Sequence, residues 1–131
     1  MELYVGGYAQ GKTDYVKRKY AGYSCTVIDG ADTELCLKDL SKQDEIVLFF
    51  HFHLWIKRLL AAGQDAETIA AAWIKMHKNC VIVADEVGNG IVPMKEADRE
   101  YRDRLGRILI SIAAQAERVE RVICGIGQIL K

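Results

Sequence analysis

The sequence predicts an α/β domain of three layers, built on a mostly parallel β-sheet. Short apolar runs rich in Val and Ile recur along the chain, and stretches with helical spacing lie between most of them. The runs are nearly continuous rather than alternating, which is typical of strands buried on both faces of a parallel sheet. Strands that alternate with helices favour right-handed crossovers, with helices covering the sheet.

Five strands are expected, each a short apolar run, at residues 2–5, 24–28, 45–50, 79–84 and 119–124. The closing segment, residues 122–130, contains Gly125 and Gly127. Glycines inside a strand often mark a bend, so this segment is expected to form a bent strand or a terminal hairpin.

The first helix is expected over residues 12–20, ending near Gly22, and residues 34–40 could form a short helix or turn. A helix over 54–62 should stop at Gly63. Asp65 can cap the next helix, because its carboxylate can accept backbone N–H groups of the first turn. The apolar face of that helix would contain Ile69, Trp73 and Ile74.

The longest helix should begin just after Pro93, the only proline. Its second half places apolar residues three and four positions apart, which predicts a buried stripe. The stripe consists of Leu105, Ile108, Leu109, Ile112, Ala113, Ala116 and Val119.

The length and composition favour a single domain over residues 1–131. They also favour a protein of the reducing cytoplasm. Lys plus Arg equals Asp plus Glu, so the charge indicates neither a nucleic-acid nor a membrane partner. No apolar run approaches the length of a bilayer span, and Met1 leads directly into the first strand, which predicts no signal peptide. The four cysteines show no zinc-ligand spacing, and Cys80 and Cys124 are expected to be buried thiols.

Residues 6–13 fit the phosphate-loop pattern G-x-x-x-x-G-K-[ST] between a strand-like run and a helix. Glycines allow successive backbone N–H groups to approach phosphate oxygens, and a helix N-terminus adds partial positive charge. The pattern therefore favours a P-loop NTPase-like domain over an ordinary glycine-rich turn. The nucleotide-binding residues would be Gly6, Gly7, Tyr8, Ala9, Gln10, Gly11, Lys12 and Thr13.

Within this loop, Lys12 would reach the terminal phosphates, and the hydroxyl of Thr13 would ligate Mg²⁺. A second motif follows the apolar run 81–84, which ends in Asp85 and Glu86. A carboxylate at that place in a phosphate-loop protein commonly holds magnesium or positions a nucleophile. Asp85 is thus expected to bind Mg²⁺, and Asp85 or Glu86 to act with Lys12 as catalytic residues. The alternative is that the two acids only cap the next element.

In parallel sheets, ligands bind beyond the carboxyl ends of the strands. Four segments are expected to meet there: the phosphate loop, residues 29–32, residues 50–53 and residues 85–93. His51 and His53 lie in one of them and are expected to contact substrate or to serve a structural role. A metal pair is disfavoured, because no third ligand is evident nearby.

Residues 85–93, Asp-Glu-Val-Gly-Asn-Gly-Ile-Val-Pro, resemble a signature of the bifunctional adenosylcobinamide kinase/adenosylcobinamide-phosphate guanylyltransferase family. Residues 101–107, the glycines of 125–127, and the phosphate loop with Thr13 in place of serine are also similar to that family. The resemblance covers residues 1–20 and 79–131, and is thin between them.

The resemblance implies a kinase of cobalamin biosynthesis that uses ATP or GTP with Mg²⁺ to phosphorylate adenosylcobinamide or a related alcohol. It also implies that Gly88 and Gly90 allow close backbone approach to substrate, and that the protein is a homo-oligomer such as a trimer.

Two departures from the family pattern bear on activity. Family members carry, after their second strand, a segment whose histidine accepts the guanylyl group. Residues 29–44 contain no histidine, arginine or proline, so the guanylyltransferase step is expected to be absent. The family also ends its third strand with an acid, where this chain has Phe50 and His51. The alternative function is therefore a catalytically degenerate module that binds a nucleotide or corrinoid, and a weaker one is a site for an unrelated phosphate-bearing ligand.

Overall fold

The predicted apolar runs form one six-stranded sheet in the computed structural model, which describes residues 1–33, 45–87 and 95–131. The strand order is β2-β3-β4-β1-β5-β6, and all neighbouring pairs are parallel except the last. The strands are β1 (Glu2–Gly6), β2 (Cys25–Asp29), β3 (Ile46–Phe50), β4 (Cys80–Asp85), β5 (Arg118–Ile123) and β6 (Ile126–Ile129). The predicted α/β class with a mostly parallel sheet is confirmed.

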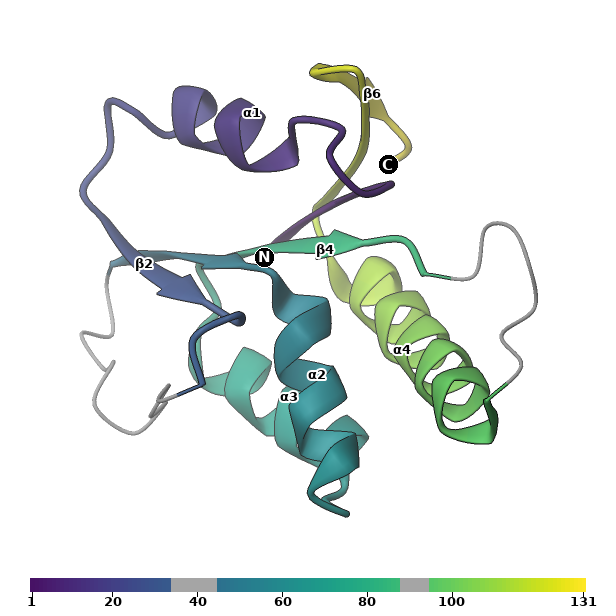
Figure 1. The fold of residues 1–131 in the computed structure, drawn as a ribbon. Coiled ribbons are helices and arrows are strands. Elements are labelled where there is room, and N and C mark those ends of the chain that lie inside the picture. Colours follow the sequence, from purple (N-terminus) through teal and green to yellow (C-terminus); the bar gives the residue numbers. More distant parts are fainter. Residues whose placement is uncertain (34–44, 88–94) are drawn as a thin grey trace.

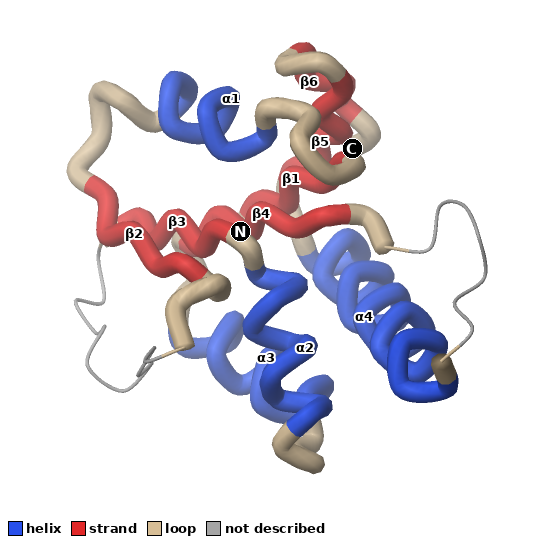
Figure 2. The backbone as a smooth tube through the Cα atoms, viewed as in Figure 1, coloured by secondary structure: helices blue, strands red, loops and turns tan. Residues whose placement is uncertain are grey.

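Helices cover both faces of this sheet, which gives the expected three layers (Figure 1). The helices are α1 (Lys12–Lys19), α2 (Phe52–Ala61), α3 (Ala66–Met76) and α4 (Glu96–Gln115). Viewed along the sheet, α1 lies on one face, and α2, α3 and α4 lie on the other (Figure 2). Asp65 caps α3 as predicted, because its carboxylate accepts the backbone N–H of Thr68 at 3.3 Å.

Alternate residues of the central strands fill two separate cores. In β4, Ile82 joins the larger core under α2, α3 and α4, whereas Val81 and Val83 join the smaller core under α1. This two-sided burial explains why the strands read as continuous apolar runs. The larger core contains both tryptophans and the predicted stripe residues Leu105, Ile108, Ile112, Ala116 and Val119.

The end of the chain forms a hairpin rather than a bent strand, since β5 and β6 pair antiparallel around a turn at Cys124 and Gly125. Both turn residues have positive φ, 50° and 73°. The prediction that Cys124 is buried is therefore wrong, because the turn carries its side chain into solvent. Cys80 is buried as expected. The expected helix or turn at 34–40 and the start of the long helix after Pro93 lie outside the described residues.

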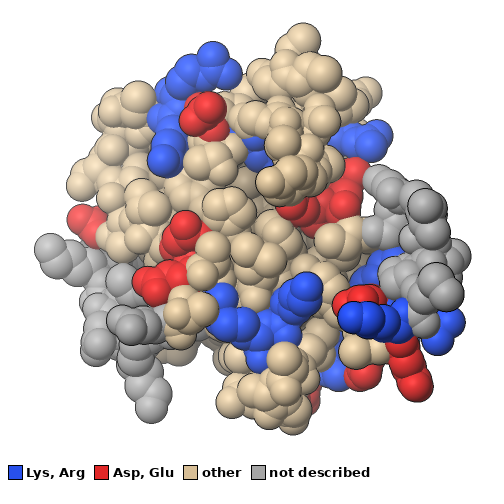
Figure 3. All heavy atoms as spheres, viewed as in Figure 1, with Lys and Arg blue, Asp and Glu red and all other residues tan. Residues whose placement is uncertain are grey.

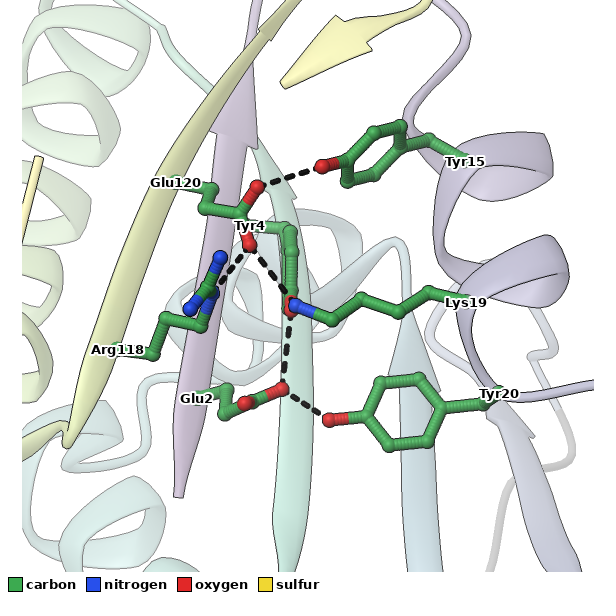
Figure 4. A network of polar contacts seen from close by, with 7 residues as sticks. All are labelled: Glu2, Tyr4, Tyr15, Lys19, Tyr20, Arg118 and Glu120. Atoms are coloured by element: carbon green, nitrogen blue, oxygen red, sulfur yellow. Dashed lines mark hydrogen bonds and ion pairs between the residues drawn. The ribbon is translucent and has the colours of Figure 1, made fainter. Parts of the chain in front are cut away.

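A polar network fastens α1 to β1 and β5 (Figure 4). Its centre is Glu120, whose side chain is only 1% exposed. One carboxylate oxygen accepts the hydroxyl of Tyr15 at 2.6 Å, and the other accepts Lys19 at 2.9 Å and Arg118 at 2.5 Å. Burial alone would raise the pKa of Glu120, but these three donors hold it near 2. The buried carboxylate is thus fully paired, and it fixes the helix that carries Lys12.

Charges of both signs are scattered over the surface shown in Figure 3. Basic side chains gather over α1, whose last turn carries Lys17, Arg18 and Lys19. No helix in the described part of the chain combines the length and apolar character needed to cross a bilayer.

Candidate active site

The phosphate-loop motif forms the connection between β1 and α1. Its backbone turns sharply, and Ala9 and Gly11 both have positive φ, 55° and 83°. At Gly6, the end of β1 lies so close to β5 that a Cβ would come within 2.4 Å of the carbonyl oxygen of Val122. Glycine is therefore required at position 6 by the close approach of β5, and it is favoured at position 11 by the positive φ.

The turn of the C-terminal hairpin holds the phosphate loop from the side. The backbone N–H of Gly125 donates to the backbone carbonyl of Gln10 at 2.8 Å. The backbone N–H of Cys124 donates to the side-chain amide oxygen of Gln10 at 2.9 Å. No motif in the sequence marks this contact, because more than a hundred positions separate its partners. Gly125 and Gly127 indicate a bend at the chain end, but not its partner.

Lys12 lies between the phosphate loop and β4. Its ammonium donates to the carbonyl of Gly7 at 2.7 Å and forms an ion pair with Asp85 at 2.6 Å. The Lys12 side chain is only 7% exposed, so the contact with Asp85 supplies a counter-charge for a nearly buried cation. The motif and the acidic end of β4 therefore meet at the same edge of the sheet, because β1 and β4 are neighbouring parallel strands.

His53 supports Asp85 from the first turn of α2. Its Nδ1 accepts the backbone N–H of Asp85 at 3.0 Å, and its Nε2 lies 3.4 Å from a carboxylate oxygen of the same residue. Burial lowers the pKa of His53, and the Asp85 carboxylate opposes this less strongly. Because Nδ1 already serves as an acceptor, the neutral ring carries its proton on Nε2, facing Asp85.

His51 takes a different position at the end of β3. Its backbone has φ 52° and ψ 41°, in the left-handed region, immediately before α2 begins. Its Nδ1 lies 2.8 Å from a carboxylate oxygen of Asp29 at the end of the neighbouring strand β2. Asp29 belongs to a segment that was expected to converge here, but nothing in the sequence singled it out.

These residues surround one pocket of about 500 Å³. Its lining consists of Tyr8, Ala9, Gln10, Gly11, Lys12, Thr13, Asp14, His51, His53, Leu54, Val83 and Asp85. Three of the four segments that were expected to converge thus contribute to the pocket lining. Asp29, from the fourth segment, contacts the His51 ring. Tyr8 is 86% exposed at the loop.

Glu86 does not line this pocket. Its carboxylate pairs with Arg121 at 3.2 Å, and it borders a separate hollow together with Leu105 and Gly106. Gly88 and Gly90 lie outside the described residues. Phe50, at the position of the family's acid, is buried in the smaller core with Lys17 over its ring.

Thr13 and Asp85 suit magnesium as ligands, because a hydroxyl and a carboxylate in the same pocket offer the oxygen donors that this ion prefers. In the described part of the chain, no group of three or more His, Cys, Asp or Glu residues could hold a metal ion. In proteins, Mg²⁺ is commonly held by one or two protein oxygens together with substrate phosphates and water.

Comparison with known proteins identifies relatives over most of the chain. The family model described as cobinamide kinase / cobinamide phosphate guanyltransferase matches residues 14–130. The match begins just after Lys12 and Thr13, so the assignment of the phosphate loop depends on its own motif and geometry.

Three curated relatives are similar over shorter stretches. The bifunctional adenosylcobalamin biosynthesis proteins CobU of Escherichia coli and of Salmonella typhimurium are each 37% identical over 71 residues, which is 54% of this chain and 39% of theirs. The corresponding protein CobP of Pseudomonas aeruginosa is 29% identical over 84 residues, 60% of this chain and 49% of its own. The matched regions therefore cover between two-fifths and one half of these relatives.

Proposed function

Because the chain belongs to the cobinamide kinase / cobinamide phosphate guanyltransferase family, we propose that it is a nucleotide-dependent kinase acting on a cobinamide-like alcohol. It transfers the γ-phosphoryl group of ATP or GTP to adenosylcobinamide or a related acceptor. The observation that carries this proposal is the contact of 2.6 Å between Lys12 and Asp85, which joins the phosphate loop to the acidic end of β4. Phosphoryl transfer needs this combination of a cation and a carboxylate around one pocket.

In the proposed reaction the chain positions its substrates and neutralises charge. The backbone of the phosphate loop binds the phosphates, and the Lys12 ammonium exchanges its contacts with Gly7 and Asp85 for phosphate oxygens. Asp85, released from Lys12, and Thr13 would then hold Mg²⁺. When bound, this ion would offset the negative charge of the phosphates.

We propose that the guanylyltransferase step is absent. A covalent guanylyl intermediate needs a nucleophile after the second strand. Residues 29–44 contain no histidine. We propose the acceptor and a homo-oligomeric state such as a trimer from the family, and a cytoplasmic location from the cysteine usage and composition of the sequence.

A second candidate function is a binding module that holds a nucleotide or corrinoid without turnover. The burial of Phe50 favours it, because an apolar core residue cannot replace a carboxylate at the end of β3.

One experiment separates the two candidates. Purified protein is incubated with Mg²⁺, cobinamide and γ-labelled ATP or GTP, and nucleotide binding is measured by calorimetry on the same sample. The kinase predicts labelled cobinamide phosphate, whereas the binding module predicts a calorimetric signal without transfer. Absence of both would contradict both functions.

The matched variants are Lys12→Ala and Lys75→Ala. Loss of the Lys12 ammonium should lower transfer at least about 100-fold, since it removes a charge aimed at the transferred group. Lys75 is an exposed lysine in the last turn of α3, so its replacement should leave transfer unchanged. Equal activity of Lys12→Ala and wild type would remove the assignment of the site.

A further inference from the structure

We propose that His51, oriented by Asp29, is the general base that removes the proton from the acceptor hydroxyl. This inference rests on the proposed kinase function and deepens it, because it assigns the proton to a residue pair that the motifs do not include. Three observations carry it: the way His51 is held, the state of its two ring nitrogens, and the occupation of the alternative bases.

His51 is fixed in an unusual backbone conformation. Its left-handed φ of 52° turns the chain from β3 into α2. The end of β2 packs directly against it: a Cβ at Gly30 would come within 2.1 Å of the His51 carbonyl oxygen, so only glycine fits there. Arg58 of α2 then donates to the carbonyls of Gly30 and Asp32, which holds this loop in place.

The contact with Asp29 determines which ring nitrogen carries the proton. Asp29 also accepts the N–H of Ala31 at 2.9 Å. Burial tends to raise the pKa of Asp29, but the bonds from Ala31 and His51 outweigh it and lower the pKa. The carboxylate is therefore ionised near neutral pH and can only accept, so Nδ1 of His51 must be the donor. The lone pair of the neutral ring then lies on Nε2.

That lone pair is available to a substrate. His51 lines the pocket beside Lys12, and within the described ranges its Nε2 makes no hydrogen bond. A histidine with Nδ1–H bound to a carboxylate and Nε2 open to the reacting groups is the arrangement in which an aspartate stabilises the imidazolium that forms.

The other candidate bases are already engaged. Asp85 pairs with Lys12, and it is the carboxylate proposed for Mg²⁺. His53 accepts a backbone N–H at Nδ1 and faces Asp85 with Nε2, so it has no lone pair for a substrate. Glu86 borders a different hollow and pairs with Arg121.

The proposed step is balanced within the pocket. The acceptor O–H proton passes to Nε2 of His51 as the acceptor oxygen bonds to the γ-phosphorus. The bond from that phosphorus to the β–γ bridging oxygen breaks, and the nucleoside diphosphate leaves with the electron pair. Among the described residues, the charged and titratable groups that act on the pair include His53, whose ring centroid lies 6.0 Å from that of His51, and Lys17 of α1, which acts on Asp29.

The test measures kcat and nucleotide KM for transfer to cobinamide between pH 5 and 9 in wild type, His51→Asn and Asp29→Asn. Asparagine tolerates the left-handed backbone at position 51. His51→Asn should lower kcat about 100-fold or more with little change in KM, and the rise of kcat with pH should disappear. Asp29→Asn should lower kcat at least about tenfold, because an amide can stabilise the wrong tautomer.

Asp103→Asn is the matched control, since its carboxylate is 54% exposed against 50% for Asp29 and lies on α4 away from the pocket. It should leave kcat unchanged. Nitrogen-15 NMR of the wild-type imidazoles gives an independent readout, with the proton of His51 expected on Nδ1 in wild type.

The failures are distinguishable. If wild type transfers no phosphate from either nucleotide, the proposed kinase function is wrong, and so is the proposed role of His51 as its base. If wild type transfers phosphate and His51→Asn keeps its kcat and pH profile, only the base assignment is overturned. A proton found on Nε2 of His51 would also overturn it.

Discussion

Lys12 shows how one side chain can have two sets of partners. Without a ligand, its buried ammonium is stabilised by Asp85 and the Gly7 carbonyl. A bare buried cation would carry a large desolvation cost, which this pairing offsets. In the proposed reaction, phosphate oxygens would replace these partners and free Asp85, so the arrival of the nucleotide would prepare the proposed metal ligand.

His53 gives a prediction about acid stability. Its folded pKa lies below the ordinary value of 6.5, mainly through burial. The unfolded chain therefore binds a proton at higher pH than the folded chain, and stability is lost as pH falls below about 6.5. His53→Asn, whose amide oxygen can still accept the N–H of Asp85, should remove this loss, which is at most about 1.4 kcal/mol per pH unit.

Urea unfolding of wild type and His53→Asn between pH 8 and 5 checks this result. The buried carboxylate of Glu120 has a pKa near 2, and its contribution is lost only as pH falls below its ordinary value of 4.5. The two effects thus occupy separate pH ranges. Parallel stability curves for the two proteins down to pH 5 would contradict the assignment to His53.

At the scale of elements, α1 and the C-terminal hairpin form one support for the phosphate loop. Glu120 of β5 fixes α1 through Tyr15 and Lys19, and the turn between β5 and β6 holds Gln10. The hairpin contributes no side chain to the pocket lining, but its turn contacts the phosphate loop directly. The helix α1 follows the loop in the chain and fixes its other end. Changes in the hairpin should therefore affect nucleotide binding.

Gly127 tests this coupling. A Cβ at this position would lie 2.1 Å from the Tyr15 hydroxyl and 2.7 Å from a Glu120 carboxylate oxygen. Gly127→Ala should therefore displace Tyr15, destabilise the protein by about 1–3 kcal/mol and weaken nucleotide affinity. Urea unfolding and calorimetry measure both quantities.

Two further variants control this experiment. Gly106 lies within α4, and a Cβ there would meet nothing within 4 Å, so Gly106→Ala should stabilise by about 0.5–1 kcal/mol. Gly127→Ala should cost less in a Tyr15→Ala background than in wild type, because both Tyr15 atoms that the new methyl group would meet, the hydroxyl oxygen at 2.1 Å and Cζ at 2.4 Å, are then absent. Similar effects of the two glycine substitutions would show that packing at Gly127 is not the cause.

At the scale of the whole molecule, the pocket lies where the carboxyl ends of β1, β3 and β4 face the start of α1. These strands are neighbours in the sheet, so residues far apart in sequence meet without any long-range signal in their own segments. Ligand binding there should stabilise the entire sheet rather than one loop.

Thermal unfolding tests this expectation and the prediction of one domain. Wild type should unfold in a single transition, and magnesium nucleotide at about 100 times Kd should add about 2.7 kcal/mol of stability. For a chain of this size that corresponds to an increase in Tm of roughly 6–10 °C. Lys12→Ala should lose most of the shift, whereas Lys75→Ala should keep it. Two separate transitions would contradict a single domain.

The amino-acid sequence by itself determined the fold class, the approximate bounds of the strands and helices, the cap at Asp65 and the meeting of Lys12 with Asp85. The elements and the cap depend on local residue patterns, and the meeting of Lys12 with Asp85 follows from the general rule that the carboxyl ends of parallel strands share one edge of the sheet. The exposure of Cys124 was missed, because a hairpin turn depends on how the last strand pairs.

Only the tertiary structure decided that Asp29 stands behind His51, that Glu86 pairs with Arg121 away from the pocket, and that the hairpin holds Gln10. Each of these contacts joins positions tens of residues apart. Their partners are chosen by strand order, register and side-chain direction, which no short stretch of sequence contains.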